Sequence, residues 1–577
     1  MRAGDKAFMI VLLSVVTVGR FAIAQPPTPS QPLLDWGSEG LEFPPIVMIN
    51  GHTPRTAQLL GAAYSNEKLV WKRAQYTAEL GLAAQQAGAV YLAEAMTDPS
   101  PLVRSEAARA AAMINDASLL PEVESLLRDE SAQVRREAVL AAARLARAHN
   151  NPSTAIDRGL DDAQAQVVAA ALEAAWAPRH APEIARRVAS LPDELKADAA
   201  LALGRLKAVD QAAAILPLLK GNVLQRSAAV RALGAMGSSA HVDSLLSMLK
   251  DPHPTVRREA IAAFAQAADA APRQARAMEM LGDSDLTVRE AAARVLTPAP
   301  SPDTLAPLAA QLEQPYAPLH DAAREALVHP ANQQVQTAVS ALASEMLTHV
   351  NPRRREDASY ILGRLRSDSS FDQHVELLQW NSEDLSATDW LVVAQAAESA
   401  GLILDQRAVE PLMTLVQPAP DVVADAPAQQ RNHMSLAMTN ALVALARLQH
   451  KPALDEAVRI IQLDPQGISP TSLRAAAAFA IGALGEPGQV PRGVSLLQIY
   501  DSVYEGRQTK FEALKALGNL RHKPSAAGLL RVAESSPAPD MRWIAHWAYE
   551  QTSEKRVPYT PPSQLDVAPV SVSDLAR

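Results

Sequence analysis

The chain has 577 residues, a formal net charge of −9 and no cysteine. The missing thiols exclude disulfides, thiolate metal sites, thioether-linked haem and a cysteine nucleophile. An acidic chain without a long basic stripe also argues against nucleic acid and against anionic membrane surfaces as partners. Hydrophobic residues make up 48% of the chain and aromatic residues only 4%. With alanine and leucine dominant, this composition favours closely packed helices over sheets.

The first 24 residues have the layout of a secretory signal peptide. A short basic start is followed by an apolar run over residues 7–19, and then by the small-x-small site Ala22-Ile23-Ala24. Cleavage is predicted between Ala24 and Gln25, which leaves 51 basic and 62 acidic residues and a net charge of about −11. The alternative is an uncleaved anchor, but the run is short for a bilayer span and Arg20 interrupts it. We expect export to the periplasm or beyond the cell, with no membrane span after the signal is removed.

Residues 25–54 are rich in proline and contain an apolar run over residues 46–49. They predict an extended lead-in that packs on the first helices. After this lead-in, a short motif recurs in which an aspartate precedes a Val-Arg pair and an alanine-rich stretch. The distance from aspartate to arginine is six residues in all four clear copies, which are Asp98 with Arg104, Asp129 with Arg135, Asp251 with Arg257, and Asp283 with Arg289.

The repeat has a period near 31 residues, which suits a pair of helices and two turns. The apolar positions taken as equivalent are Val103, Val134, Val167, Leu195, Leu224, Val256 and Val288. Weaker copies predict an all-α superhelix of about 15 helix pairs over residues 55–552. A Pro/Ala-rich stretch at 417–430 predicts a mobile insertion, and residues 553–577 predict a disordered tail.

The Asp-to-Arg spacing, the Val-Arg-x-x-Ala phrase and the Leu-Gly helix endings resemble HEAT repeats, specifically the short bacterial type found in phycobilin lyase subunits. The resemblance implies an armadillo-type α-α solenoid. It also implies that the recurring Asp and Arg side chains hydrogen-bond between neighbouring repeats and align them. The competing hypothesis makes the arginines a ladder that receives acidic partners, because guanidinium groups bind carboxylates bidentately.

A catalytic site is not expected. A HEAT-type hydroxylase builds its di-iron centre from His-Glu dipeptides, whereas none of the 13 histidines here precedes a glutamate, and His320-Asp321 is the nearest approach. Nucleophile elbows, phosphate loops, dinucleotide-binding turns and zinc-binding His-Glu-x-x-His helices are all missing from the sequence. We therefore predict no enzyme, no cofactor and no metal site.

Trp543 and Trp547 share one face of the last predicted helix, four residues apart. They are interpreted as a cap on the end of the stack, with a partner anchor as the alternative. The leading functional hypothesis is a protein-interaction scaffold of the cell envelope that binds its partners along the concave face. The alternatives are an accessory subunit of an envelope enzyme and, third, a lyase-like or other enzyme with a cryptic site.

Overall fold

The structure, a computed structural model, describes residues 54–83, 85–297, 300–329, 333–379, 387–417, 427–462, 471–553 and 555. The predicted signal peptide, its cleavage residues Ala24 and Gln25, the lead-in up to residue 53, residues 418–426 of the predicted insertion and the tail from residue 556 lie outside these ranges. Helices and turns account for all regular structure in the described residues, and no strand occurs there. The all-α prediction is therefore confirmed.

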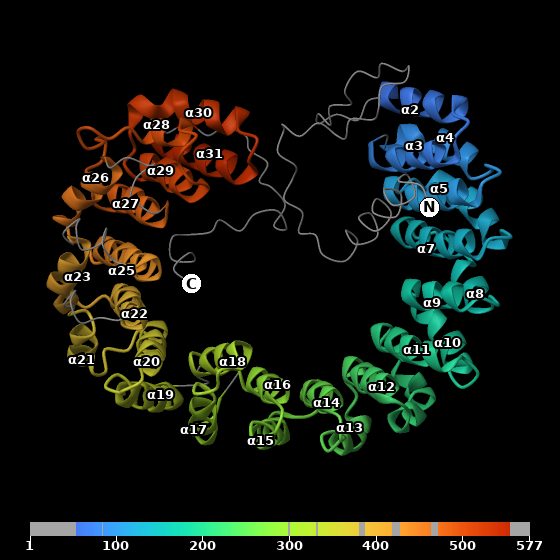
Figure 1. Ribbon diagram of the computed structural model, residues 1–577, viewed down its shortest axis with the longest axis horizontal. Coiled ribbons are helices and arrows are strands. Elements are labelled where there is room, and N and C mark those ends of the chain that lie inside the picture. The colour runs from blue at the N-terminus through green and yellow to red at the C-terminus, as the bar shows by residue number, and fades with distance from the viewer. Residues whose placement is uncertain are drawn as a thin grey trace. The chain divides into compact units, whose positions relative to one another are not determined.

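The chain divides into two units, Met1–Trp176 and Ala177–Arg577, and each is described by itself. Unit 1 holds four helix pairs, in which each first helix packs beside the second helix that follows it (Figure 1). The first helices are α2 (Pro54–Asn66), α4 (Ala89–Ala95), α6 (Leu120–Ser125) and α8 (Ala155–Leu160). The second helices are α3 (Val70–Ala83), α5 (Pro101–Ile114), α7 (Ala132–His149) and α9 (Ala165–Ala174).

Unit 2 continues the same arrangement with eleven pairs within its described residues. Its first helices are α10 (Ala181–Arg187), the 3-10 helices η5 (Val209–Ala214) and η6 (Leu216–Lys220), α13 (Val242–Met248), α15 (Ala270–Met280), α17 (Pro302–Gln311), α19 (Gln333–Met346), α21 (Phe371–Glu376), α23 (Val409–Val416), α26 (Ala453–Gln462), α28 (Leu496–Asp501) and α30 (Ala526–Ser535). Its second helices are α11 (Asp193–Arg205), α12 (Val223–Met236), α14 (Pro254–Ala267), α16 (Leu286–Leu296), α18 (Ala317–Leu327), α20 (Pro352–Leu365), α22 (Ala387–Ile403), α25 (Ala428–Arg447), α27 (Thr471–Leu484), α29 (Arg507–Asn519) and α31 (Pro539–Ser553).

In each unit the second helices pack on one another in chain order and form one layer, while the first helices form the other (Figure 1). We call the first of these the second-helix layer. With four pairs in unit 1 and eleven in unit 2, the described residues contain 15 pairs. This agrees with the predicted number. Helices α21 to α31 share one hydrophobic core, which includes the fully buried Ala441 and Leu514.

Successive second helices approach so closely that some contact positions admit only glycine or alanine. A Cβ atom added to Gly204 would lie 2.7 Å from the Cα atom of Ala232, and one added to Gly363 would lie 2.8 Å from the Cα atom of Ser399. The Leu-Gly helix endings seen in the sequence therefore mark close helix crossings. Neither helix of a pair can bury its apolar side alone, so each pair depends on its neighbours in the stack.

The structure defines the start of the helix that follows the predicted insertion. The insertion was predicted to extend to residue 430, but α25 begins at Ala428, so its first turn occupies the last three residues of the predicted loop. Pro427 stands at the N-cap of this helix, where its fixed φ and missing N–H are tolerated. None of the described helices is both long enough and apolar enough to cross a bilayer.

Candidate functional site

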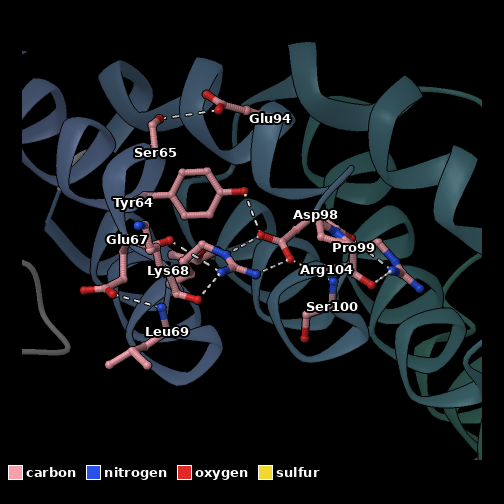
Figure 2. A network of polar contacts seen from close by, with 12 residues as sticks. Tyr64, Ser65, Glu67, Lys68, Leu69, Glu94, Asp98, Pro99, Ser100 and Arg104 are labelled. Carbon is pink, nitrogen blue, oxygen red and sulfur yellow. Dashed lines mark hydrogen bonds and ion pairs between the residues drawn. The ribbon is translucent and has the colours of Figure 1, made fainter.

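The polar residues singled out by the sequence lie at the turns between first and second helices, where they join one repeat to the next. Arg104 on α5 donates from Nε and Nη2 to the two carboxylate oxygens of Asp129, at 2.7 and 2.8 Å. Arg135 on α7 makes the same fork with Asp162, at 2.6 and 3.0 Å. The first member of the series is Arg73 with Asp98. Figure 2 shows Asp98 at this end of the series, with the Tyr64 hydroxyl donating to it at 3.2 Å.

The spacing of six residues has a direct geometric basis. Arg104 uses its remaining nitrogen, Nη1, to donate to the backbone carbonyls of Asp98 and Pro99 in its own turn, at 3.0 and 3.1 Å (Figure 2). The carboxylate of Asp98 accepts the backbone N–H of Ser100 at 2.8 Å, which closes the turn just before α5. Each arginine thus fixes its own turn and the following repeat at once. We call this series of pairs the Arg–Asp ladder.

In unit 2 the ladder is interrupted. Arg257 binds Asp283 at 2.8 Å from both nitrogens, and Arg355 binds Asp389 at 2.9 Å. Two further pairs occupy the C-terminal repeats, namely the buried Arg474 with Glu505 and Arg507 with Asp540. Arg289 donates to the backbone carbonyl of Asp283, and the described structure shows no carboxylate of the following repeat bound to it.

One of the apolar positions assigned from the sequence was wrong. Leu224 is 74% exposed, whereas Val103, Val134 and Val256 at the positions taken as equivalent are fully buried. Gln225 is buried in its place, and Arg226 is the ladder residue that binds Asp251, at 2.7 and 3.0 Å. This repeat begins with Gly221 instead of an aspartate, so its arginine escaped the Asp-to-Arg search.

A second spacing would have located the arginines that were missed. Arg73, Arg104 and Arg226 each precede their carboxylate partner by 25 residues, and the Arg257 and Arg135 pairs are separated by 26 and 27. The period of the helix pair sets this distance. It identifies Arg73 and Arg226, and it also identifies Asp162, whose own repeat lacks the arginine.

The ladder carboxylates are ionised more readily than free aspartates. Burial alone would raise the pKa of Asp129, but the hydrogen bonds from Arg104 and from the Ser131 N–H outweigh it and lower this pKa below the ordinary value. The pKa values of Asp98, Asp162, Asp251 and Asp283 are lowered for the same combination of reasons. Burial raises the pKa of Tyr64, and the neighbouring Asp98 carboxylate raises it further. The ladder is therefore charged near neutral pH.

His320, the closest approach to a His-Glu dipeptide, is buried in the second-helix layer. Its Nε2 lies 3.0 Å from a carboxylate oxygen of Asp357, which is fully buried on α20. Arg324 lies 3.8 Å from the other oxygen of that carboxylate. Among the residues that the structure describes, no group of three or more His, Asp or Glu side chains is arranged to hold a metal ion. The pair instead joins α18 to α20.

The two tryptophans of α31 point back toward the preceding repeat. The ring of Trp543 stacks on Phe511 of α29 with 6.5 Å between centroids. The ring of Trp547 lies over Gly518, where an added Cβ atom would come within 2.5 Å of it. Both side chains are half-buried against the core. This packing gives them a structural part in the last two repeats.

Comparison with known proteins identifies the repeats. A family model described as HEAT repeats matches residues 89–177, 181–265 and 242–328. The chain resembles a structure of a Kap95:Nup1 complex with a TM-score of 0.57 and 13% identity, over 86% of this chain and 78% of that one. A Kap121p mutant structure gives a TM-score of 0.49 at 13% identity, over 86% of this chain, and the chain spans 65% of that protein's length. No curated protein matches the sequence at a significant level.

The likeness to these structures is one of fold, because the sequence identity is low. The matched repeats, the paired helices and their stacking agree with one another in both units. The chain has an α-solenoid fold, and its residues 89–177 and 181–328 match HEAT repeats.

Proposed function

We propose that this chain is a non-catalytic scaffold of the cell envelope that binds other proteins along its second-helix layer. The observation that carries the proposal is the layer itself. In unit 2 it runs from α11 to α31, and each of its helices packs on the next helix in the row. Such a surface can hold a partner across several repeats, or several partners at once.

The ladder supports this proposal through its position. Its charged groups lie at the turns, are directed into the next repeat and are mostly shielded, with side-chain exposures of 11% for Arg104 and 7% for Asp129. They are engaged with one another and leave the exposed face of the second helices to other residues. Among these are Arg144 on α7 and Arg231 on α12, both exposed. The ladder therefore sets the spacing of the repeats while the helix faces supply the binding surface.

The Kap95:Nup1 complex supports the proposal by analogy, because there a protein of the same fold is bound to another protein. The envelope setting rests on the first 24 residues alone, whose layout predicts export. The placement is tested by mass spectrometry of the N-terminus in fractionated cells. A mature chain that begins at Gln25 in the envelope or medium supports export, and an intact Met1 in the cytoplasm contradicts it.

The binding surface is tested by site-specific crosslinking in cells. A photoreactive amino acid at Arg144 or Arg231 places the probe on the second-helix layer. The matched controls carry it at Ser125 on α6 or Ser247 on α13, which are exposed on first helices. We expect the same partner proteins to crosslink from the second-helix positions and much less from the controls. Equal capture from both layers, or capture of no protein under several growth conditions, would refute the scaffold hypothesis.

A further inference from the structure

Helices α20, α22 and α25 lie side by side in the second-helix layer (Figure 1), and three arginines lie at the C-terminal ends of α20 and α25. Arg364 lies in the last turn of α20, Arg366 follows at its C-cap, and Arg447 lies in the last turn of α25. Gly363 packs on Ser399 of α22, and Gly401 of α22 packs on Ala444. These two close crossings bring the ends of the three helices together.

The carboxylate of Glu398 lies beside Arg364 and acts electrostatically on Arg447. Glu398 on α22 is 6% exposed, and one of its oxygens is 3.5 Å from Nη2 of Arg364 while the other accepts a 2.9 Å hydrogen bond from Gln395. Burial lowers the pKa of Arg447. Glu398 opposes this shift, whereas Arg364 and Arg366 add to it. The three guanidinium groups and the Glu398 carboxylate together carry two excess positive charges in an otherwise acidic protein.

The donors of this cluster are incompletely used. Within the described part of the chain, Arg447 makes no hydrogen bond or ion pair although it is half-buried. The Nε of Arg364 is buried and has no acceptor there either. Arg366 is exposed and has a left-handed backbone conformation with φ of 51°. A buried or half-buried guanidinium without an acceptor is unfavourable, because the group loses hydrogen bonds to water without replacement.

The helix ends account for part of the arrangement. Cations are favoured in the last turn of a helix, where the backbone carbonyls concentrate negative potential. That preference explains how Arg364 and Arg447 are tolerated, but it does not require them to converge on one glutamate. The ladder shows the contrast, since Arg104 there has three carboxylate contacts, two to Asp129 and one to Glu130, and two carbonyl contacts.

We infer that Arg364, Arg366 and Arg447 form a receptor for an acidic segment of a partner protein. This inference rests on the proposed function and names the chemistry of one binding site within it. Two carboxylates would neutralise the excess charge and supply acceptors to the half-buried Arg447 and the exposed Arg366. Guanidinium groups bind carboxylates bidentately, and their arrangement across three adjacent helices suits side chains spaced along an extended peptide.

The test uses the purified protein and a fluorescein-labelled peptide of six glutamates, with six glutamines as the peptide control, followed by fluorescence anisotropy. Binding that weakens with added salt is expected for the glutamate peptide alone. Arg447→Gln and Arg366→Gln should each weaken it roughly tenfold. Arg158→Gln, which removes an equal charge from an exposed position on the first helix α8 in unit 1, should leave it unchanged.

Thermal stability separates a binding role for Arg447 from a structural one. If Arg447 is held for a ligand, Arg447→Gln keeps or raises the melting temperature, because a half-buried cation without a partner is removed. A lower melting temperature with unchanged peptide binding would identify it as the counter-ion of Glu398 and overturn the inference. Equal binding by wild type and the Arg366/Arg447 double variant would also overturn it. So would displacement of the peptide by inorganic phosphate at equal charge concentration, which marks a small-anion site.

The outcomes also separate this inference from the scaffold hypothesis. Partners captured at Arg144 and Arg231 without any binding of the glutamate peptide would reject the acidic receptor alone. Peptide binding without any captured partner would reject the scaffold and leave only an isolated anion site.

Discussion

The substitution Asp129→Ala tests whether the Arg–Asp ladder holds neighbouring repeats together. It removes two hydrogen bonds from Arg104 and the hydrogen bond that the Ser131 N–H donates to Asp129. It also leaves Arg104, which is only 11% exposed, without the Asp129 carboxylate. Breaking a shielded ion pair in this way costs about 3 kcal/mol, and the lost hydrogen bond in the turn adds about 1 kcal/mol. We expect a local destabilisation of about 4 kcal/mol around α5 to α7.

Hydrogen exchange followed by mass spectrometry is the appropriate assay, because a solenoid can open repeat by repeat and a single unfolding transition can miss a local change. Exchange in peptides of α6 and the start of α7 should accelerate by roughly a thousandfold, the equivalent of about 4 kcal/mol. The exposed pair of Lys451 with Glu486 provides the control, since Lys451→Met should change local stability by less than about 1 kcal/mol.

The companion variant Arg104→Met removes the charge and keeps much of the aliphatic stem. If the two residues act as a pair, the double variant should be less destabilised than the sum of the single variants by about 2 kcal/mol. Exchange within about fivefold of wild type in Asp129→Ala, or full additivity in the double variant, would refute the view that the ladder fastens the repeats.

Four further predictions concern individual buried or closely packed groups. His374 is fully buried, and burial lowers its pKa from 6.5 to about 4. The unfolded chain therefore binds a proton at this residue below pH 6.5 that the folded chain does not. The stability that neutral His374 contributes is present above pH 6.5 and is lost as the pH falls toward 4. In His374→Gln the melting temperature should therefore depend less on pH between 6.5 and 4. The ladder aspartates have lowered pKa values, so they contribute stability above the unfolded pKa of 3.8. Acid titration of the wild type should therefore show a second decrease in stability below that pH. Gly363→Ala should destabilise α20 and α22 by about 1 to 3 kcal/mol in urea unfolding, because its Cβ would lie 2.8 Å from the Cα atom of Ser399. The control Gly282→Ala, whose Cβ would lie 3.4 Å from its nearest atom, should change the stability much less. Trp547→Ala should reduce local stability by about 2 to 3 kcal/mol, measured by hydrogen exchange in α29 and α31. If hydrogen exchange accelerated elsewhere but not in these two helices, the packing described would be contradicted.

The sequence alone determined the fold class and the number of helix pairs. Leucine and alanine at helical spacing, repeated near every 31 residues, allow only a stack of helix pairs, because such a pair cannot bury its apolar sides by itself. The period is local information carried by each repeat separately. This is why the prediction remained correct in the C-terminal repeats, where Val-Arg phrases are weak.

The pairing of charges depended on positions one full repeat apart, and only the tertiary structure decided it. The spacing of six residues describes contacts within one turn, such as Arg104 with the Asp98 carbonyl. The ion pairs instead cross to the next repeat, so Arg226 and Arg73 were missed and Leu224 was assigned to the core. The sequence does not predict that Arg364, Arg366 and Arg447 lie near one another, because they belong to helix ends up to 83 residues apart. Close packing at Gly363 and Gly401 brings these helix ends together. Periodicity determines which residues belong to a repeat, whereas contacts between repeats depend on helix crossings that follow from side-chain volume.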